Sequence, residues 1–199
     1  MPIDANEHDN TAYFVYGPDL RLTARVIGGD AQTTRPLEFA AASRDGHPAE
    51  VIAPGALAEA NLNGCSLLIW QAPLPSAKEN GILQSFITAG GVVIFFPTGQ
   101  PDAGQFDGLG WGALQAADNP DGFRVARWDQ DEGPLAKSDE HLSLPLGQTT
   151  FRRRQPVVGQ KEALAAFDDG TAFLVEQDLG KGQVYFCSSL PDAAWSSLS

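Results

Sequence analysis

Residues 66–96 read SLLIWQAPLPSAKENGILQSFITAGGVVIFF, and this stretch decides the fold class. Residues 66–70 and 92–96 are continuously apolar, as strands buried on both faces of a sheet are. Between them, Ser76 and Glu79 fit a capping box, and apolar residues then follow at helical spacing until a pair of glycines. The stretch therefore predicts a strand, a helix and a second, parallel strand joined by a right-handed crossover.

Two further strands and two helices are predicted upstream of this unit. Residues 12–16 (AYFVY) are aromatic and β-branched and end at a Gly-Pro pair, so they predict a first strand. Residues 19–27 are expected to form a helix, residues 36–43 a second strand, and residues 56–62 a short helical segment. Together with residues 66–96, these elements predict an α/β fold with a mainly parallel central sheet and helices on both faces.

The C-terminal half is predicted to consist mostly of strands and hairpins. Residues 98–122 are rich in glycine and proline and predict a loop. Strands are expected at residues 123–128 and 149–158, and the tight turns at Asp169-Gly170 and at residues 180–182 predict two hairpins. These strands should extend the central sheet in mixed direction, including antiparallel pairs.

Length and charge limit the function. The chain has 199 residues and a net charge of -12, which argues against nucleic-acid partners because phosphate binding needs clustered cations. No apolar run approaches the roughly 20 residues of a membrane helix, so this segment is not expected to insert into a membrane. Residues 11–199 are predicted to form one domain behind a frayed tail at residues 1–10.

Motifs that indicate a cofactor or a metal are missing from the sequence. There is no GxGxxG, no GxxxxGK[ST], no GxSxG elbow and no Cys/His cluster, so no cofactor and no metal site are expected. Asp129, Asp131 and Glu132 are interpreted as loop residues, with a calcium site as the alternative. Cys65 and Cys187 are interpreted as buried free thiols, and a disulfide between them is the alternative.

The isolated basic residues are interpreted as surface groups. Residues 152–154 (Arg-Arg-Arg) predict a solvated strand with its charge on an exposed face or edge of a sheet. The histidines lie in the N-terminal tail, in a turn and in a polar segment, so all are expected at the surface: His8, His47 and His141.

TAYFVYGPD at residues 11–19, the unit at residues 66–99 and DDGTAFLVEQDLGKGQVYFCSSLPDAAWSSL at residues 168–198 resemble one known family. They resemble class I glutamine amidotransferase-like domains, most closely those in bacterial aerotolerance-regulator (BatA-type) membrane proteins. The resemblance covers most of the chain. It implies a flavodoxin-like, three-layer α/β sandwich.

The resemblance also bears on catalysis. In active amidotransferases, the turn after the strand that matches residues 92–96 presents a cysteine nucleophile. Here that turn reads Pro97-Thr98-Gly99-Gln100, without cysteine or serine, and no His-x-Glu follows the late strand at residues 184–187. The resemblance therefore implies a non-catalytic domain with a binding or assembly role.

Two other functions stay open at the carboxyl edge of the sheet, where ligands of open α/β folds gather. An enzyme with a non-standard site there would use Gln71, Thr98, Gln100 and Asp102, with Thr98 as the candidate nucleophile. A sensor module would bind a small ligand, whose identity the sequence does not give, through Gln71, Thr98, Gly99 and Gln100 without chemistry.

The resemblance further implies a location. In the proteins that this chain resembles, the segment that matches Trp195 continues toward a transmembrane helix, and the positive-inside rule places the domain outside the cytoplasm. We therefore expect a periplasmic domain of an inner-membrane protein, with protein partners in an envelope complex. If the chain is a stand-alone protein, a cytoplasmic location is expected.

Overall fold

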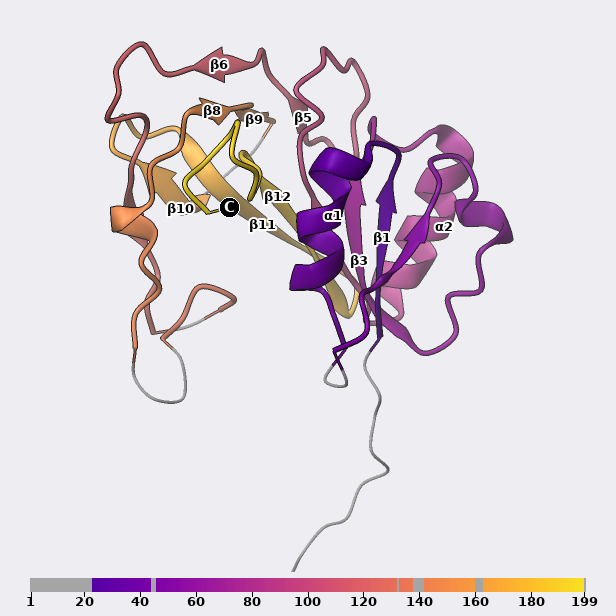
Figure 1. Cartoon of the computed structure of the whole chain (residues 1–199). Helices are drawn as coiled ribbons and strands as arrows, with labels where there is room; N and C mark the ends of the chain where they lie inside the picture. The colour runs from indigo at the N-terminus through magenta and orange to yellow at the C-terminus, as the bar shows by residue number, and fades with distance from the viewer. Residues whose placement is uncertain (1–22, 44–45, 132, 138–141, 160–162, 199) are drawn as a thin grey trace, which may run out of the picture.

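The computed structural model describes all residues except 1–22, 44–45, 132, 138–141, 160–162 and 199 (Figure 1). The first half holds β1 (Thr23–Gly28), α1 (Ala31–Ala40), β2 (Glu50–Ile52), the short 3-10 helix η1 (Leu57–Glu59), β3 (Cys65–Gln71), α2 (Ala77–Thr88) and β4 (Val92–Phe95). The second half holds β5 (Gly110–Trp111), β6 (Gln115–Ala116), β7 (Val125–Trp128), η2 (Leu146–Gln148), β8 (Arg153–Arg154), β9 (Val157–Val158), β10 (Ala163–Phe167), β11 (Ala172–Leu179) and β12 (Gly182–Cys187).

One large sheet organises the described chain, with eight strands in the order β2-β1-β3-β4-β12-β11-β10-β7. β1 pairs in parallel with β2 and β3, and β4 pairs in parallel with β3 and β12. From β12 outward, β11, β10 and β7 run antiparallel to their neighbours. The prediction of an α/β fold with a mainly parallel central sheet and added antiparallel strands is therefore confirmed.

The predicted strand–helix–strand unit is confirmed as β3, α2 and β4, with β3 and β4 adjacent and parallel. The Glu79 carboxylate accepts hydrogen bonds from the Ser76 amide at 2.9 Å and from the Ser76 hydroxyl at 2.6 Å, which fixes the start of α2. Gly90 follows the helix with a φ of +115°, a backbone conformation that favours glycine. The chain can therefore turn directly from α2 into β4.

The helix predicted at residues 19–27 is wrong where the structure describes it, because residues 23–28 form β1. Val26 and Ile27 are neighbours in sequence and both are fully buried. Val26 packs in the cluster that holds Leu37 of α1, whereas Ile27 packs in the cluster that holds Leu83 of α2. Adjacent residues point to opposite faces only in a strand. The strand predicted at residues 12–16 lies outside the described residues.

The strand predicted at residues 36–43 is also wrong, because residues 31–40 form α1. The helix starts where the Asp30 carboxylate accepts a hydrogen bond from the Gln32 amide at 2.9 Å. Thr34 and Leu37, three positions apart, form its buried face. Pro36 lies within the helix and removes one amide donor without ending it. The short strand β2 follows and was not predicted.

The C-terminal half matches its prediction in part. The two predicted hairpins are confirmed as β10–β11 and β11–β12, and the predicted strand at residues 123–128 is confirmed as β7. The single strand predicted at residues 149–158 is wrong. Instead, β8 and β9 pair with β6 and β5 in two separate small sheets, because the chain turns between them at Gln155-Pro156. The helical segment predicted at residues 56–62 is reduced to η1.

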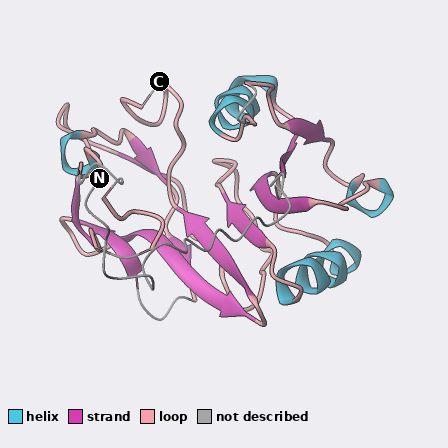
Figure 2. Cartoon of the chain, turned by 90° about the horizontal axis from the view of Figure 1, so that it is seen from below, coloured by secondary structure: helices cyan, strands magenta, loops and turns pink. Residues whose placement is uncertain are grey.

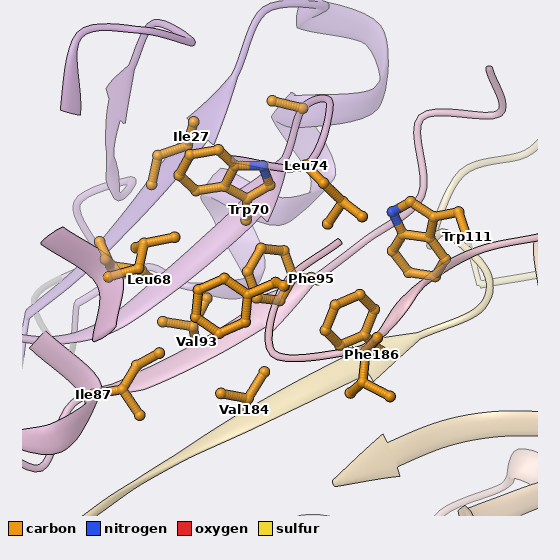
Figure 3. Packing of buried hydrophobic residues seen from close by; sticks show 14 of the residues in the cluster. Ile27, Leu68, Trp70, Leu74, Ile87, Val93, Phe95, Trp111, Val184 and Phe186 are labelled. Atoms are coloured by element: carbon orange, nitrogen blue, oxygen red, sulfur yellow. The ribbon is translucent and has the colours of Figure 1, made fainter. Parts of the chain in front are cut away.

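Apolar side chains cover both faces of the parallel strands, and Figure 2 shows helices on either side of the strand layer. On the α2 side, the Phe95 and Phe186 rings stack with centroids 4.6 Å apart, and Trp111 lies 5.0 Å from Phe186 (Figure 3). On the α1 side, Leu37 packs with Trp195 of the C-terminal segment. The sheet therefore has a core on each face.

Glycine lets β12 begin directly beneath the end of α2. A Cβ atom on Gly182 would lie 2.1 Å from the Gly91 carbonyl oxygen and 2.4 Å from the Ile87 carbonyl oxygen. Both obstacles are backbone atoms, which cannot rotate away. A side chain at residue 182 would therefore push β12 away from β4 and α2.

Candidate functional site

Gln71 is the most buried of the predicted ligand-binding residues and lies at the carboxyl edge of the parallel strands. It ends β3 and is 5% exposed. Its Nε2 donates to the Pro97 carbonyl at 3.4 Å, and its Oε1 accepts from the Thr33 and Thr34 hydroxyls at 3.1 and 3.3 Å. The side-chain amide therefore joins the turn after β4 to the first turn of α1.

Thr98, Gly99 and Gln100 form the turn after β4, next to Gln71, so the structure brings the four predicted ligand-binding residues to one edge. The Thr98 hydroxyl accepts a hydrogen bond from the Gln100 amide at 3.2 Å. A threonine nucleophile needs an adjacent base, and a backbone amide cannot act as one. A catalytic role for Thr98 therefore stays a prediction that this geometry does not favour.

Gln155 fills the same edge, although no sequence motif indicates it. The residue is 1% exposed. Its Oε1 accepts from the Gly99 amide at 3.1 Å, and its Nε2 donates to the Gln100 and Gly112 carbonyls at 3.0 and 3.1 Å. A lone glutamine before a proline carries no sequence signal. Its side chain binds the turn after β4 to the loop before β6.

Asp102, the remaining candidate for an enzymatic site, is also bonded to backbone. Its Oδ2 accepts from the Leu74 amide at 2.6 Å and its Oδ1 from the Gly104 amide at 2.8 Å. The carboxylate thus anchors the loop after β4 to the loop after β3. The polar side chains of Gln71, Asp102 and Gln155 hold this edge together rather than facing an open site.

A pocket of about 620 Å³ lies on the opposite side of the sheet from α2, over β4, β12 and β11. Strand register builds this sheet-face pocket: Ile94 is paired with Tyr185, and Tyr185 with Glu176, so all three side chains share one face. Leu135 and Leu146, from the segment between β7 and β8, line it as well. In β12, Gln183, Tyr185 and Cys187 alternate with the buried Val184 and Phe186, and this alternation is the sequence signal for a second face.

One end of the sheet-face pocket is polar. The Glu176 carboxylate accepts from Gln183 Nε2 at 2.8 Å and from the Tyr185 hydroxyl at 2.9 Å. Burial, and then the hydrogen bond and charge of Glu176, raise the pKa of Tyr185 well above its usual value. The phenol therefore keeps its proton and remains a hydrogen-bond donor at physiological pH.

The two cysteines are free, as predicted, and neither is an activated thiol. Cys187 lines the apolar part of the sheet-face pocket, and burial raises the pKa of its thiol to about 12. Cys65 is half-buried, and desolvation also raises the pKa of its thiol. Nucleophilic and redox cysteines have lowered pKa values, and burial shifts the pKa of both thiols in the opposite direction.

The interpretation of Arg152 to Arg154 as solvated residues is wrong for Arg154, which is 4% exposed. Its guanidinium lies 3.9 Å from the centroid of the Phe123 ring and forms an ion pair with Asp169. The hydrogen bonds from Arg154 hold the Asp169 pKa well below its usual range. The alternation of the strand turns Arg154 inward while Arg153 stays exposed.

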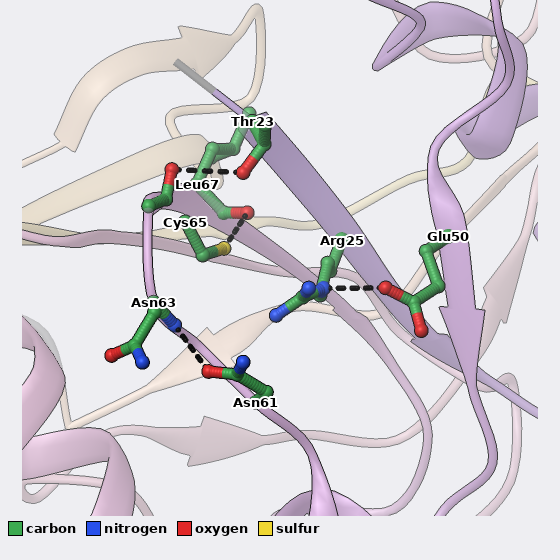
Figure 4. A network of polar contacts seen from close by, with 8 residues as sticks. Thr23, Arg25, Glu50, Asn61, Asn63, Cys65 and Leu67 are labelled. Atoms are coloured by element: carbon green, nitrogen blue, oxygen red, sulfur yellow. Dashed lines mark hydrogen bonds and ion pairs between the residues drawn. The ribbon is translucent and has the colours of Figure 1, made fainter. Parts of the chain in front are cut away.

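A second set of polar contacts lies at the amino ends of β1 and β3 and includes Arg25 (Figure 4). The Arg25 Nε donates to the Glu50 carboxylate at 2.7 Å, which ties β1 to β2. The Cys65 thiol donates to the Leu67 carbonyl at 3.3 Å in the same region. The ion pair joins two strands, whereas the thiol contact stays within β3.

Among the described residues, no group of three or more His, Cys, Asp or Glu side chains could hold a metal ion. His47 is exposed, as predicted, whereas His8 and His141 lie outside the described residues. Glu132, one of the residues of the alternative calcium site, also lies outside the described residues. No helix in the described ranges is long and apolar enough to cross a membrane.

No family model and no curated protein matches the sequence. Solved structures match in fold. A β-galactosidase from Bacillus circulans sp. alkalophilus is 14% identical with a TM-score of 0.56, over 87% of this chain and 29% of that chain. A catalytic mutant of a GH42 β-galactosidase from G. stearothermophilus is 15% identical with a TM-score of 0.51, over 84% of this chain and 27% of that chain.

A cytoplasmic protein from Salmonella typhimurium LT2 is 12% identical with a TM-score of 0.52, over 87% of this chain and 90% of that chain. The chain thus spans less than a third of the matched galactosidases but nearly the whole length of the Salmonella protein. At these identities the likeness shows the fold alone.

These comparisons overturn the resemblance to glutamine amidotransferase-like and BatA-type domains, because the matching structures are of other kinds. The reason is physical. The quoted stretches hold a capped helix between two buried strands and a glycine-rich hairpin, which are common in unrelated chains of this topology. Such motifs specify elements and not a family. The chain therefore shares its fold with part of a GH42 β-galactosidase, and no family model matches its sequence.

Proposed function

We propose that this chain is a non-catalytic binding module and that its ligand occupies the sheet-face pocket. The single observation that carries the proposal is the pocket itself: about 620 Å³ over β4, β12 and β11, with apolar walls and one polar end. Binding sites for small molecules have this size and this combination of apolar walls with a few convergent polar groups.

The carboxyl edge supports the non-catalytic part of the proposal. A site for chemistry needs a nucleophile, a base and a free position for the reacting atom. Here the Gln155 amide and the Asp102 carboxylate are already bonded to backbone groups of the turn and its neighbouring loops. A ligand that used the Gly99 amide or the Gln100 carbonyl would first have to break their hydrogen bonds to Gln155.

We also propose that the parallel half has the flavodoxin-like, three-layer arrangement. The order β2-β1-β3-β4-β12 corresponds to strands 2-1-3-4-5 of that fold. The packing of α1 and α2 on opposite faces supports the same description. In this arrangement β11, β10 and β7 are an addition beyond the fifth parallel strand.

We further propose protein partners in an envelope complex and a periplasmic location, with the cytoplasm as the location of a stand-alone protein. Fractionation of bacteria that express the native gene would test the location. Recovery of the protein in the periplasmic or inner-membrane fraction would agree with it, and recovery in the cytosol would contradict it.

A neutral apolar probe tests the binding site. We expect 1-octanol to shift the methyl NMR signals of Ile94, Leu135 and Leu174 in a saturable way, because burial of its chain against these walls is favourable. Leu135→Gln should weaken the apparent affinity about tenfold, because a polar group replaces part of the wall.

The matched control is Leu114→Gln. Leu114 is 41% exposed and does not line the pocket, so this change should leave octanol binding unaltered. Absence of saturable shifts at the three pocket residues, up to the solubility limit of octanol, would overturn the proposed function.

A further inference from the structure

Polarity changes along the sheet-face pocket from one end to the other. On β12 the side chains that line the pocket run from Gln183 through Tyr185 to Cys187, and Tyr185 is paired with Glu176 and Cys187 with Leu174 on β11. Because a strand rises about 3.3 Å per residue, the four steps from the polar end to the apolar end cover about 13 Å. A ligand that fills this space is apolar along most of its length and polar at one end.

The polar end carries negative charge. Glu176 accepts hydrogen bonds from Gln183 and Tyr185, which are uncharged donors. Within the part of the chain that the structure describes, the ion pairs of lysine and arginine go to Glu50, Asp121, Asp131 and Asp169, and none goes to Glu176. In the described chain, uncharged donors therefore hold the Glu176 carboxylate, and a cation beside it would gain Coulomb energy in a partly desolvated site.

The charged residues near Glu176 do not cancel the negative charge at the polar end of the pocket. A second pocket of about 540 Å³ shares Glu176 and also holds Asp178, Arg127 and Asp129. Arg127 is exposed to solvent and forms no ion pair with Glu176 in the described chain. The Tyr185 phenol is neutral at physiological pH, and so is the Cys187 thiol.

We infer that the sheet-face pocket selects an elongated apolar molecule with a protonated amine at one end, and that Glu176 is the counter-ion for the amine. This inference rests on the proposed function and names its ligand class. The ammonium group would donate to Glu176, while the alkyl or aryl body would lie against Ile94, Leu174 and Leu135. A negatively charged end, such as the carboxylate of a fatty acid, would be repelled by Glu176.

Three probes of equal length separate charge from apolar burial: octylammonium, 1-octanol and octanoate. Titration followed by methyl NMR should give the tightest binding for octylammonium, about five- to tenfold weaker binding for octanol and the weakest for octanoate. Glu176→Gln should lower the octylammonium affinity about five- to tenfold, so that octylammonium no longer binds more tightly than octanol. The substituted amide can still accept from Tyr185, so the fold should be kept.

Glu59→Gln is the matched control, because Glu59 is an exposed carboxylate that does not line the pocket. This control separates selection by Glu176 from general attraction to a chain with a net charge of -12. We expect it to leave all three affinities unaltered. Equal weakening of octylammonium by Glu59→Gln and Glu176→Gln would overturn the inference.

The outcomes distinguish the two proposals. If octanol binds at Ile94, Leu135 and Leu174 and octylammonium binds no tighter, the amine inference fails and the binding module stands. If none of the three probes shifts these residues, both fail. Preference for octanoate would also overturn the inference, because it would show that a cation, and not Glu176, determines which charged ligand binds at the polar end.

Discussion

Arg154 shows how one buried cation is accommodated in an acidic chain. The residue is 4% exposed, and its guanidinium stacks on Phe123 while it donates to Gln115 at 2.7 Å and to Asp169. A buried charge without partners would cost several kcal/mol. The planar guanidinium can satisfy an amide, a carboxylate and an aromatic face together, which lysine cannot do. Arg154 therefore fastens β8 to the β10–β11 hairpin.

This ion pair should make stability depend on pH. The Arg154 guanidinium holds the Asp169 pKa well below its usual range, so the folded chain binds that proton more weakly than the unfolded chain. The pair therefore stabilises the fold above the unfolded carboxyl pKa of about 3.9, and the contribution is lost as the pH falls below it. We expect Asp169→Asn to cost about 1 kcal/mol near neutrality, a value reduced for the half-exposed carboxylate.

Thermal unfolding of wild type and Asp169→Asn over a pH series measures this effect. The difference in Tm should be largest near neutrality and shrink in acid. Asp168→Asn, an exposed neighbour in the same turn, controls for the loss of a carboxylate at this hairpin. A difference between wild type and Asp169→Asn that is independent of pH would contradict the ion-pair account.

At the scale of elements, α2 has the clearest local determinants. Glu79 accepts from the Ser76 amide and hydroxyl, and also from the Gly55 amide at 3.2 Å, so one carboxylate both caps the helix and holds the loop after β2. By contrast, α1 contains Pro36 and has one side-chain cap, from Asp30. Tertiary packing of Thr34 and Leu37 compensates for the weaker local signals in α1.

Removal of the α2 cap should therefore have a measurable cost. We expect Glu79→Ala to lower the free energy of unfolding by about 1 kcal/mol, because the Ser76 amide at the N-cap and the Gly55 amide of the loop lose their acceptor. Lys78→Ala, at the exposed neighbouring position, should change stability by less than about 0.5 kcal/mol. Urea unfolding followed by circular dichroism measures both, and equal costs for the two changes would show that the cap contributes nothing.

In the molecule as a whole, β12 joins the parallel and antiparallel parts of the sheet. It pairs in parallel with β4 on one side and antiparallel with β11 on the other. Its Phe186 is fully buried, stacks on Phe95 and lies 5.0 Å from the Trp111 ring. The core on the α2 side thus includes residues from both parts of the chain, which should make the described domain unfold as one unit.

Phe186→Ala tests this cooperativity. We expect a loss of about 3–5 kcal/mol in the free energy of unfolding, because the change leaves a cavity beside two aromatic rings. Phe39→Ala is the matched control, since Phe39 is 54% exposed and should cost little. Tryptophan fluorescence and far-UV circular dichroism should report the same midpoint in the variant. Separate midpoints would show that the two parts of the sheet unfold independently.

Part of the fold could be predicted from sequence because its signals are local. The Ser76/Glu79 cap, the apolar runs of β3 and β4, and the turn residues at Asp169-Gly170 each act within a few positions of the chain. Where local signals were ambiguous, the prediction failed. Val26 and Ile27 fit a helix or a buried strand, and only the covering of both sheet faces makes them part of β1.

The sequence by itself determined the α/β class, the β3-α2-β4 unit and the two C-terminal hairpins, because apolar runs, a capping pair and turn residues that each span a few positions specify them. Only the tertiary structure decided that Gln155 fills the carboxyl edge, that Arg154 is buried and that Ile94, Tyr185 and Glu176 share one pocket. Each of these depends on residues far apart in the chain: Gly99 with Gln155, Arg154 with Asp169, and β4 with β12. No local pattern encodes such contacts, because the folded sheet itself brings the partners together.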